Sequence, residues 1–371
     1  MEAVIFTQDY KRRGVLPVLS GKLTMRHNGV HDFELVINGN HPGWRRFTPG
    51  WRVRIEDHGQ VLASGWVTKI EESYQAGVTD VTMLGVSDEA WLAATVTLPD
   101  PSRPPTEQTA EAYYKAKGPA ETVIRDLIGK QIGPQAHPGF RRPLALTTDH
   151  GTGHQVTINT RYKNLLEEVQ ALARAGGVSF RIVQYGADRA STLEFVDRQD
   201  LSRAVRLTEK NGTVAGFVLS RQAPEVTGVI VAGQGQGKAR NIRYVTGNAS
   251  DWGVQVVEFR DRRDTDDPAE LTQAGTERLT EGQESASVTL KTMDRPGYVF
   301  GRRFMLGDTI TVDLGQGRKV VDVVQTAEIE WSESGRQVTL QVGPVGDELD
   351  KPAWVKIVKR LQASVSVQAT I

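Results

Sequence analysis

Alternating apolar and polar positions run through the first quarter of the chain and predict short antiparallel strands. Residues 21–26 and 33–37 both alternate, and Asn28-Gly29 between them is a pair typical of a tight hairpin turn. Another turn is predicted at 57–60, before a further apolar strand. We therefore expect residues 1–98 to form a small antiparallel barrel or sandwich.

A proline-rich segment follows this first β region. Four prolines occur in the seven residues from Pro99 to Pro105. Because proline lacks a backbone donor and has a fixed φ, this density disfavours both a helix and a central strand. Residues 99–110 are therefore predicted to be a linker.

Helical periodicity begins after the linker. Apolar residues fall on one face at 120–128, and again at 165–173. Asn164 stands near the start of the second helix and Gly176-Gly177 at its end. Two strand-like segments then complete a predicted α+β insert at 111–210. These strands are expected at residues 178–183 and 191–196.

The remaining chain returns to strand patterns. We predict a second β region at 211–343, interrupted by one helix at 268–281 that Asp266 or Asp267 caps. Its first three strands are expected at 214–220, 226–233 and 252–259. The last segment, 344–371, is predicted to be an extension with a short helix and a strand-like tail. Such a tail is suited to adding an edge strand to a sheet, in the same chain or in another.

The two β regions contain similar phrases, which suggests a duplicated domain. Each has a phenylalanine, two residues, a glycine, two residues and then an alternating strand. From glycine to a later isoleucine the spacing is 20 residues for Gly50 and Ile70, and 22 for Gly307 and Ile329. Two similar units per chain let a ring of chains imitate a ring of twice the order. The alternative is that any two β meanders look alike. The matching phrases are 47–57 with 304–313, 66–72 with 324–330, and 81–85 with 338–343.

Composition limits the classes of function. A chain of 371 residues is long enough for two to four domains. Lys+Arg and Asp+Glu both number 45, and this balance argues against a dedicated nucleic-acid binder. The absence of cysteine excludes disulfides, thiolate nucleophiles and cysteine-based zinc sites. No apolar run is long enough to span a membrane, and residues 1–11 do not resemble a signal peptide, so folding in the cytosol is expected.

Two glycine-containing segments partly match binding motifs. Residues 233–238 follow an apolar strand, but a phosphate-binding P-loop requires glycine at Ala232 and serine or threonine at Ala239. A mobile surface loop is the better interpretation. His150 and His154 have the spacing of a metal-binding pair, but two glycines lie between them and no third ligand is evident. No metal or cofactor is therefore predicted.

Acidic and nucleophilic groups also lack the spacing that chemistry requires. The aspartates at 261–267 miss the glycine and glutamate positions of a calcium loop, and are interpreted as a solvated loop before a helix. Glu71 and Glu72 are expected at a strand end, facing opposite ways. No G-x-S-x-G elbow is present. We predict no catalytic residues and no enzyme. Trp44, Trp51, Trp66 and Trp91 could form a sugar-binding platform, although packing is the favoured role.

The order of these phrases resembles the baseplate hub or tail-associated proteins of long-tailed bacteriophages, a siphophage family related to the central hub of contractile tails. The resemblance covers nearly the whole chain. It rests on phrases at 33–37, 50–55, 164–180, 226–235 and 306–312. It implies a mainly β fold, in which two tube-like antiparallel β-barrel domains are separated by a small α+β domain.

The resemblance also implies a function and partners. The chain would be a structural virion protein, made in the host cytoplasm: a homotrimeric hub whose six barrels make a pseudo-six-fold ring at the tail tip. Its partners would be itself, the distal tail protein ring, the tape-measure protein and tip or fibre proteins, the last through residues 344–371. Larger family members carry host-binding or lytic domains, and none is evident here. A cell-wall carbohydrate-binding module and an unrecognised hydrolase are the alternatives.

Overall fold

The computed structural model describes residues 1–344 except 42–43, 49, 76, 188, 248–251 and 254. The predicted helix and strand of the C-terminal extension lie outside the described residues. Contacts within the chain define two compact units. The first comprises Met1–Gly216 and the chain from Leu290 onward, and the second comprises Phe217–Thr289. The division into domains that was predicted from the sequence stays a prediction.

The predicted hairpin of the first β region is confirmed. Leu23 lies opposite Phe33 across the turn that holds Asn28, which has a left-handed φ of 51°. The strands of this region form the row β3-β4-β7-β6-β5-β1-β2. Their bounds are β1 (Glu2–Phe6), β2 (Arg12–Leu16), β3 (Val18–Arg26), β4 (Asp32–Asn38), β5 (Arg52–Asp57), β6 (Gln60–Gln75) and β7 (Val78–Ser87), with η1 (Trp44–Arg46) between β4 and β5.

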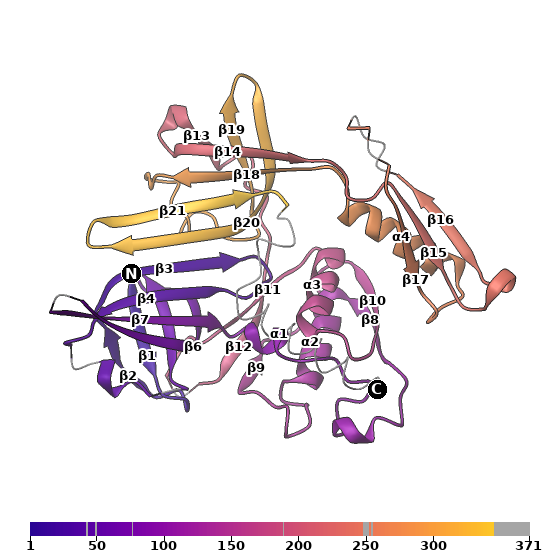
Figure 1. The fold of residues 1–371 in the computed structure, drawn as a ribbon, viewed down its shortest axis with the longest axis horizontal. Coiled ribbons are helices and arrows are strands. Elements are labelled where there is room, and N and C mark those ends of the chain that lie inside the picture. Colours follow the sequence, from indigo (N-terminus) through magenta and orange to yellow (C-terminus); the bar gives the residue numbers. More distant parts are fainter. Residues whose placement is uncertain are drawn as a thin grey trace. The chain divides into compact units, whose positions relative to one another are not determined.

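The second β region continues the same sheet. Its row is β14-β18-β21-β20, and β20 pairs antiparallel with β3 (Figure 1). Among the described residues, 13 strands belong to this one sheet. β19 pairs with the first half of β20, and β13 pairs with β19. The mainly β fold with an α+β insert is confirmed. The strands are β13 (Arg206–Thr208), β14 (Val214–Gln222), β18 (Ser285–Thr292), β19 (Thr309–Gly315), β20 (Arg318–Ser332) and β21 (Gly335–Val342), with η3 (Glu209–Asn211) after β13.

The two meanders β5-β6-β7 and β19-β20-β21 repeat each other residue by residue. Arg52 pairs with Trp66 as Thr309 pairs with Val323, and Ile70 pairs with Met83 as Ala327 pairs with Leu340. The bulge between Val67 and Lys69 recurs between Val324 and Thr326. Corresponding residues are 257 positions apart in these pairs, whereas the register differs at the hairpin end, where Glu56 pairs with Val61 but Asp313 pairs with Lys319. The alignment of Ile70 with Ile329 was therefore wrong by two residues, since the residue equivalent to Ile329 is Glu72.

The α+β insert packs two helices against short strands. Asn164 caps its second helix by accepting bonds from the amides of Leu166 and Glu167, and Gly177 ends that helix with a left-handed φ of 70°. Both predicted helices and the predicted strand pair are present, while the strands at 114–119 and 155–160 were not predicted. The elements are α1 (Ala90–Ala93), η2 (Pro105–Glu107), β8 (Tyr114–Pro119), α2 (Ala120–Gln131), β9 (Leu144–Leu146), β10 (Gln155–Thr160), α3 (Leu165–Gly176), β11 (Ser179–Val183) and β12 (Ser191–Val196).

The second compact unit comprises the last part of β14, the first part of β18 and the chain between these two strands. A three-stranded sheet carries α4 (Pro268–Glu281), which Asp267 caps through the amide of Ala269 at 2.8 Å. Leu271 and Leu279 of the helix pack on Val229 and Val231 of the sheet. Sequence analysis placed this segment within a β region and did not identify it as a unit of its own. The strands are β15 (Gly228–Ala232), β16 (Ile242–Thr246) and β17 (Val257–Asp261), with η4 (Gly237–Ala239) after β15.

Candidate functional site

The glycine segment at 233–238 and the segment that holds His154 each take part in ordinary local structure. The glycine segment after β15 leads into the short η4, not into the long helix of a P-loop. His154 lies beside β10, where its amide donates to the carbonyl of Gly176 and its carbonyl accepts from the amide of Ala120. Among the residues that the structure describes, no three potential ligands gather in a metal-binding group. No helix in this part of the chain is long and apolar enough to cross a membrane.

The acidic groups also pair locally. Asp261 accepts from Arg240 and Arg263, and Asp264 accepts from Arg262 in a two-bond pair at 2.9 Å. Glu71 and Glu72 were expected at a strand end. That expectation was wrong, because both lie within the exposed second half of β6. That position follows from the length of β6, which continues through Gln75.

The four tryptophans do not form one platform. Trp66 and Trp91 stack on each other at 5.8 Å between ring centroids, and both pack against the core of the insert. Trp51 instead meets the edge of Phe47, and Trp44 donates through Nε1 to the carbonyl of Gly39. The favoured packing role fits the Trp66–Trp91 pair.

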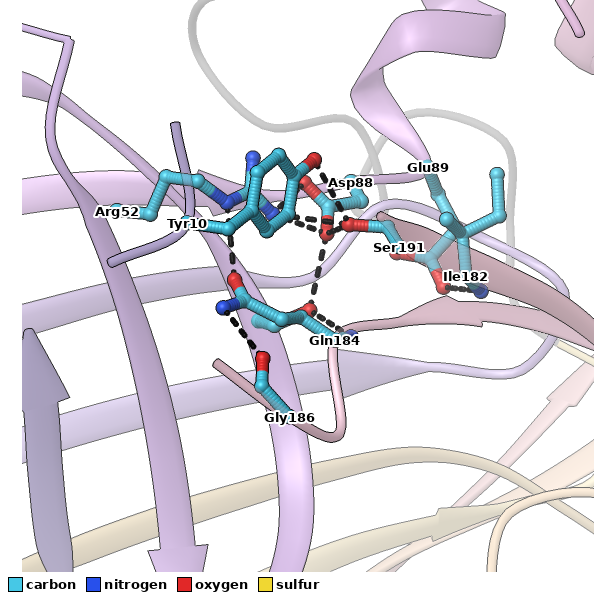
Figure 2. Close-up of polar contacts among 9 residues, drawn as sticks. Tyr10, Arg52, Asp88, Glu89, Ile182, Gln184, Gly186 and Ser191 are labelled. Atoms are coloured by element: carbon cyan, nitrogen blue, oxygen red, sulfur yellow. Dashed lines mark hydrogen bonds and ion pairs between the residues drawn. The ribbon is translucent and has the colours of Figure 1, made fainter. Parts of the chain in front are cut away.

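A buried polar cluster joins the first β region to the insert (Figure 2). Arg52 of β5 lies against Asp88, which follows β7, with Nη2 at 2.5 Å from Oδ2 and 2.7 Å from Oδ1. From the insert, Gln184 accepts from Arg52 Nε at 3.0 Å, and Ser191 donates to Asp88 at 2.7 Å. Ser64 of β6 also donates to Asp88 and accepts from the amide of Gln184. All five side chains are buried.

Aromatic rings surround the arginine of this cluster. The Arg52 guanidinium lies 4.5 Å from the ring centroid of Tyr10 and 5.6 Å from that of Trp91. Burial raises the pKa of Tyr10, so its hydroxyl stays protonated beside Ser191 at 3.3 Å. Every charge in the cluster is matched by an opposite charge or a hydrogen bond, which is the condition for burying an ion pair. The cluster therefore serves to fix the insert on the β region. Sequence reasoning missed it because its members are distributed from residue 10 to residue 191.

Glu89 is a second buried acid next to this cluster. Its Oε1 accepts from the amide of Ile182 (Figure 2), with 2.7 Å between the two atoms. Burial raises the pKa of Glu89 to about 7, although the bond from Ile182 opposes the shift. The carboxyl therefore changes charge near neutral pH inside the fold.

We predict that Glu89→Gln flattens the pH dependence of stability on the alkaline side. Between the ordinary pKa of 4.5 and the folded value of about 7, the folded state holds the Glu89 proton more tightly than the unfolded state. Stability should therefore fall as pH rises through this window, by up to roughly 3 kcal/mol at about 1.4 kcal/mol per pKa unit. Glutamine keeps the acceptor for Ile182 and stays neutral.

Urea unfolding at pH 5 and pH 8 measures this effect. From pH 5 to pH 8 the unfolding free energy of Glu89→Gln should rise relative to that of the wild type, whereas the control Glu107→Gln, at an exposed residue away from the cluster, should show no such rise. An equal pH dependence in Glu89→Gln and the wild type would show that the buried carboxyl does not titrate in this range.

Two histidines of the β3–β4 hairpin affect the pH dependence of stability in the opposite direction to Glu89. Burial lowers the pKa of His31 to about 3 and that of His27 to about 4. His31 Nδ1 accepts from the amide of Arg26 at 3.1 Å, and His27 Nε2 lies 2.7 Å from Ser179 Oγ of the insert. Since both rings are neutral when folded, acid should cost stability below pH 6.5.

Three solved structures share this fold across nearly their whole length. A tail protein from Neisseria meningitidis MC58 matches with a TM-score of 0.61 and 11% identity, over 93% of this chain and 97% of its own. A 43 kDa tail protein of prophage MuSo2 from Shewanella oneidensis matches with a TM-score of 0.59 and 13% identity, over 92% and 98%. Prophage tail protein gp18 from Listeria monocytogenes EGD-e matches at 0.53 and 10%, over 99% and 100%. The fold is therefore one found in phage tail proteins.

The family follows from the sequence match. Residues 2–344 match the model of the siphovirus ReqiPepy6 Gp37-like proteins, and the chain belongs to that family. The resemblance to tail-associated proteins of long-tailed phages is thereby confirmed. No curated protein matches this chain.

Proposed function

We propose that this protein is the structural hub at the distal end of a long-tailed phage's tail tube, acting as a homotrimer. The observation that carries the proposal is the residue-by-residue repeat of β5-β6-β7 in β19-β20-β21. Two equivalent β regions per chain let three chains present six equivalent surfaces. Such a ring matches the six-fold symmetry expected of the distal tail ring.

The role is mechanical, with no chemical step. The sheet edges of neighbouring β regions meet and are thereby covered, which also protects them from aggregation. The lumen of the ring passes or blocks the tape-measure protein and DNA. Tip or fibre proteins attach on the distal side, through residues 344–371. The family and the fold support a structural tail protein of the virion. No observation favours the carbohydrate-binding alternative, since Trp66 and Trp91 stack on each other and pack against the core.

Native mass tests the proposal most directly. Light scattering on a sizing column should give about three times the chain mass of 40.8 kDa. The same column run over a hundred-fold range of loading concentration separates a stable trimer from a weak one. A monomer at all concentrations, alone and with the purified distal tail ring, would contradict the trimeric hub.

A further inference from the structure

The second half of β6 has one bare edge. Thr68–Gln75 pairs with β7 on one side, while β5 pairs only with the first half of β6. Among the described residues no strand lies on the other side. All eight residues of this half are exposed, including Ile70 at 36% and Tyr74 at 75%. An exposed edge with apolar side chains is a surface that normally finds a partner strand.

The equivalent half of β20 has its partner in the same chain. Thr326–Ser332 pairs with β21 on one side and antiparallel with β3 on the other. Trp331, the residue equivalent to Tyr74, is only 9% exposed there, and Ala327 and Ile329 are fully buried. Trp331 lies opposite Gly21 of β3 and covers it so closely that a Cβ at Gly21 would be 2.1 Å from the ring. The bare edge of β6 thus corresponds to the edge of β20 that pairs with β3 in the same chain, but it has no partner strand among the described residues.

The strand order indicates which strand is suited to pair with the bare edge of β6. The row β3-β4-β7-β6-β5 in the first region corresponds to β14-β18-β21-β20-β19 in the second, so β14 is the counterpart of β3. β14 is the last strand of its row and has no second neighbour among the described strands. It exposes Phe217 at 40% and Val218 at 64%, and a Cβ at Gly216 would meet nothing within 4 Å. β14 therefore presents an apolar edge with a glycine, as β3 does.

We propose that the second half of β6 pairs antiparallel with β14 of a second copy of this chain, with Tyr74 covering Gly216 of that copy. The proposal rests on the ring described above and specifies its contact surface. In the internal junction Trp331 lies opposite Gly21, and Ile329 opposite Leu23. The same register places Tyr74 opposite Gly216 and Glu72 opposite Val218 of the next copy.

A second copy is the partner that the repeat requires. Each chain carries one bare β6 edge and one bare β14 edge, on different surfaces, so the contact is heterologous and can close a ring. Internal β20–β3 junctions then alternate with β6–β14 junctions between copies. Each chain contributes eight strands in one row, β14-β18-β21-β20-β3-β4-β7-β6, so three chains give 24. Barrels of 16 to 18 strands already enclose an interior as wide as an aqueous channel, so a ring of 24 strands encloses a lumen at least as wide.

Disulfide trapping tests the register in a chain that contains no cysteine of its own. In Tyr74→Cys/Gly216→Cys, directly opposed residues come within the Cα distance that a disulfide needs. Mild oxidation should yield dimers and closed trimers on a non-reducing gel, and reduction should abolish them. Tyr74→Cys/Phe217→Cys is the matched control, because Phe217 projects from the opposite face of β14.

The outcomes separate this inference from the proposed function. A native trimer in which the Tyr74/Gly216 pair traps no better than the Tyr74/Phe217 control overturns the edge pairing and leaves the trimeric hub standing. A chain that stays monomeric overturns both. Trapping that stops at a symmetric dimer overturns the heterologous ring.

A charge variant provides a second readout. Ile70→Lys/Tyr74→Lys should raise the concentration at which the assembly dissociates by at least about ten-fold, because lysines on an edge oppose strand pairing. Val321→Lys, on the first half of β20 with Val321 at 55% exposure, is the control and should leave assembly unchanged. Wild-type assembly in the double-lysine variant would overturn the pairing.

Discussion

Asp88→Ala should destabilise the protein by about 3–5 kcal/mol, as expected when one member of a buried ion pair is removed. Asp88 provides the carboxylate that faces Arg52, and it also accepts from Ser64 and Ser191. Without it, a buried guanidinium keeps its charge between the rings of Tyr10 and Trp91. Urea unfolding at pH 7 with a linear extrapolation measures the loss.

Two further variants identify the cause. Arg52→Met/Asp88→Leu removes both charges and should recover a large part of the stability, because apolar pairs often replace buried ion pairs with little loss. Glu71→Ala breaks the exposed Lys69–Glu71 pair, with both side chains more than half exposed, and should cost less than about 1 kcal/mol. An Asp88→Ala loss as small as that of Glu71→Ala would mean that the cluster does not hold the insert in place.

Local signals made much of the fold predictable. The Asn28 hairpin, the Asn164 cap and the Asp267 cap each lie within a few residues of the element they define. The Arg52–Asp88 cluster was not predictable in this way, since its partners Gln184 and Ser191 come from a different part of the chain. No residue type or spacing marks such a cluster until the fold brings its members together.

The repeat was visible in the sequence, but its register was not. Matching Ile70 to Ile329 follows chemical similarity, whereas the paired strands match Ile70 to Ala327. The reason is physical: Ile329 is buried against β3, and the equivalent Glu72 is exposed on a bare edge, so the two positions have different environments. Equivalent positions in the two meanders therefore carry different residue types, isoleucine where the strand is covered and glutamate where it is exposed.

The second compact unit was hidden for a related reason. The first β region joins β3 to β4 through a short hairpin, and the second region joins β14 to β18 through the whole of β15, β16, β17 and α4. Because all of these strands alternate, their pattern does not show where one sheet ends and another begins. Strand order, which the sequence does not display, makes the correspondence between β3 and β14 evident.

Gly21→Ala should cost about 1–3 kcal/mol, although the added group is a single methyl. A Cβ at this position would lie 2.1 Å from Trp331 Cζ2, so the indole must leave its place over β3. Gly216→Ala is the matched control, because nothing lies within 4 Å of that position in a single chain. Its effect on the stability of the monomer should stay within about 0.5 kcal/mol.

A double-mutant cycle shows whether the indole is the cause. Trp331→Ala alone should cost about 3–5 kcal/mol, because it empties a buried site at the β20–β3 junction. Gly21→Ala in that background should cost little further, since the atoms that it would strike are gone, and the two losses should fall short of additive. Full additivity would mean that glycine serves the backbone of β3 rather than the indole. If Gly21→Ala and Trp331→Ala prove to be coupled, the same reasoning applies to Gly216. Loss of the trimer in Gly216→Ala, without loss of monomer stability, would then indicate that Tyr74 of a neighbouring copy covers Gly216 as Trp331 covers Gly21.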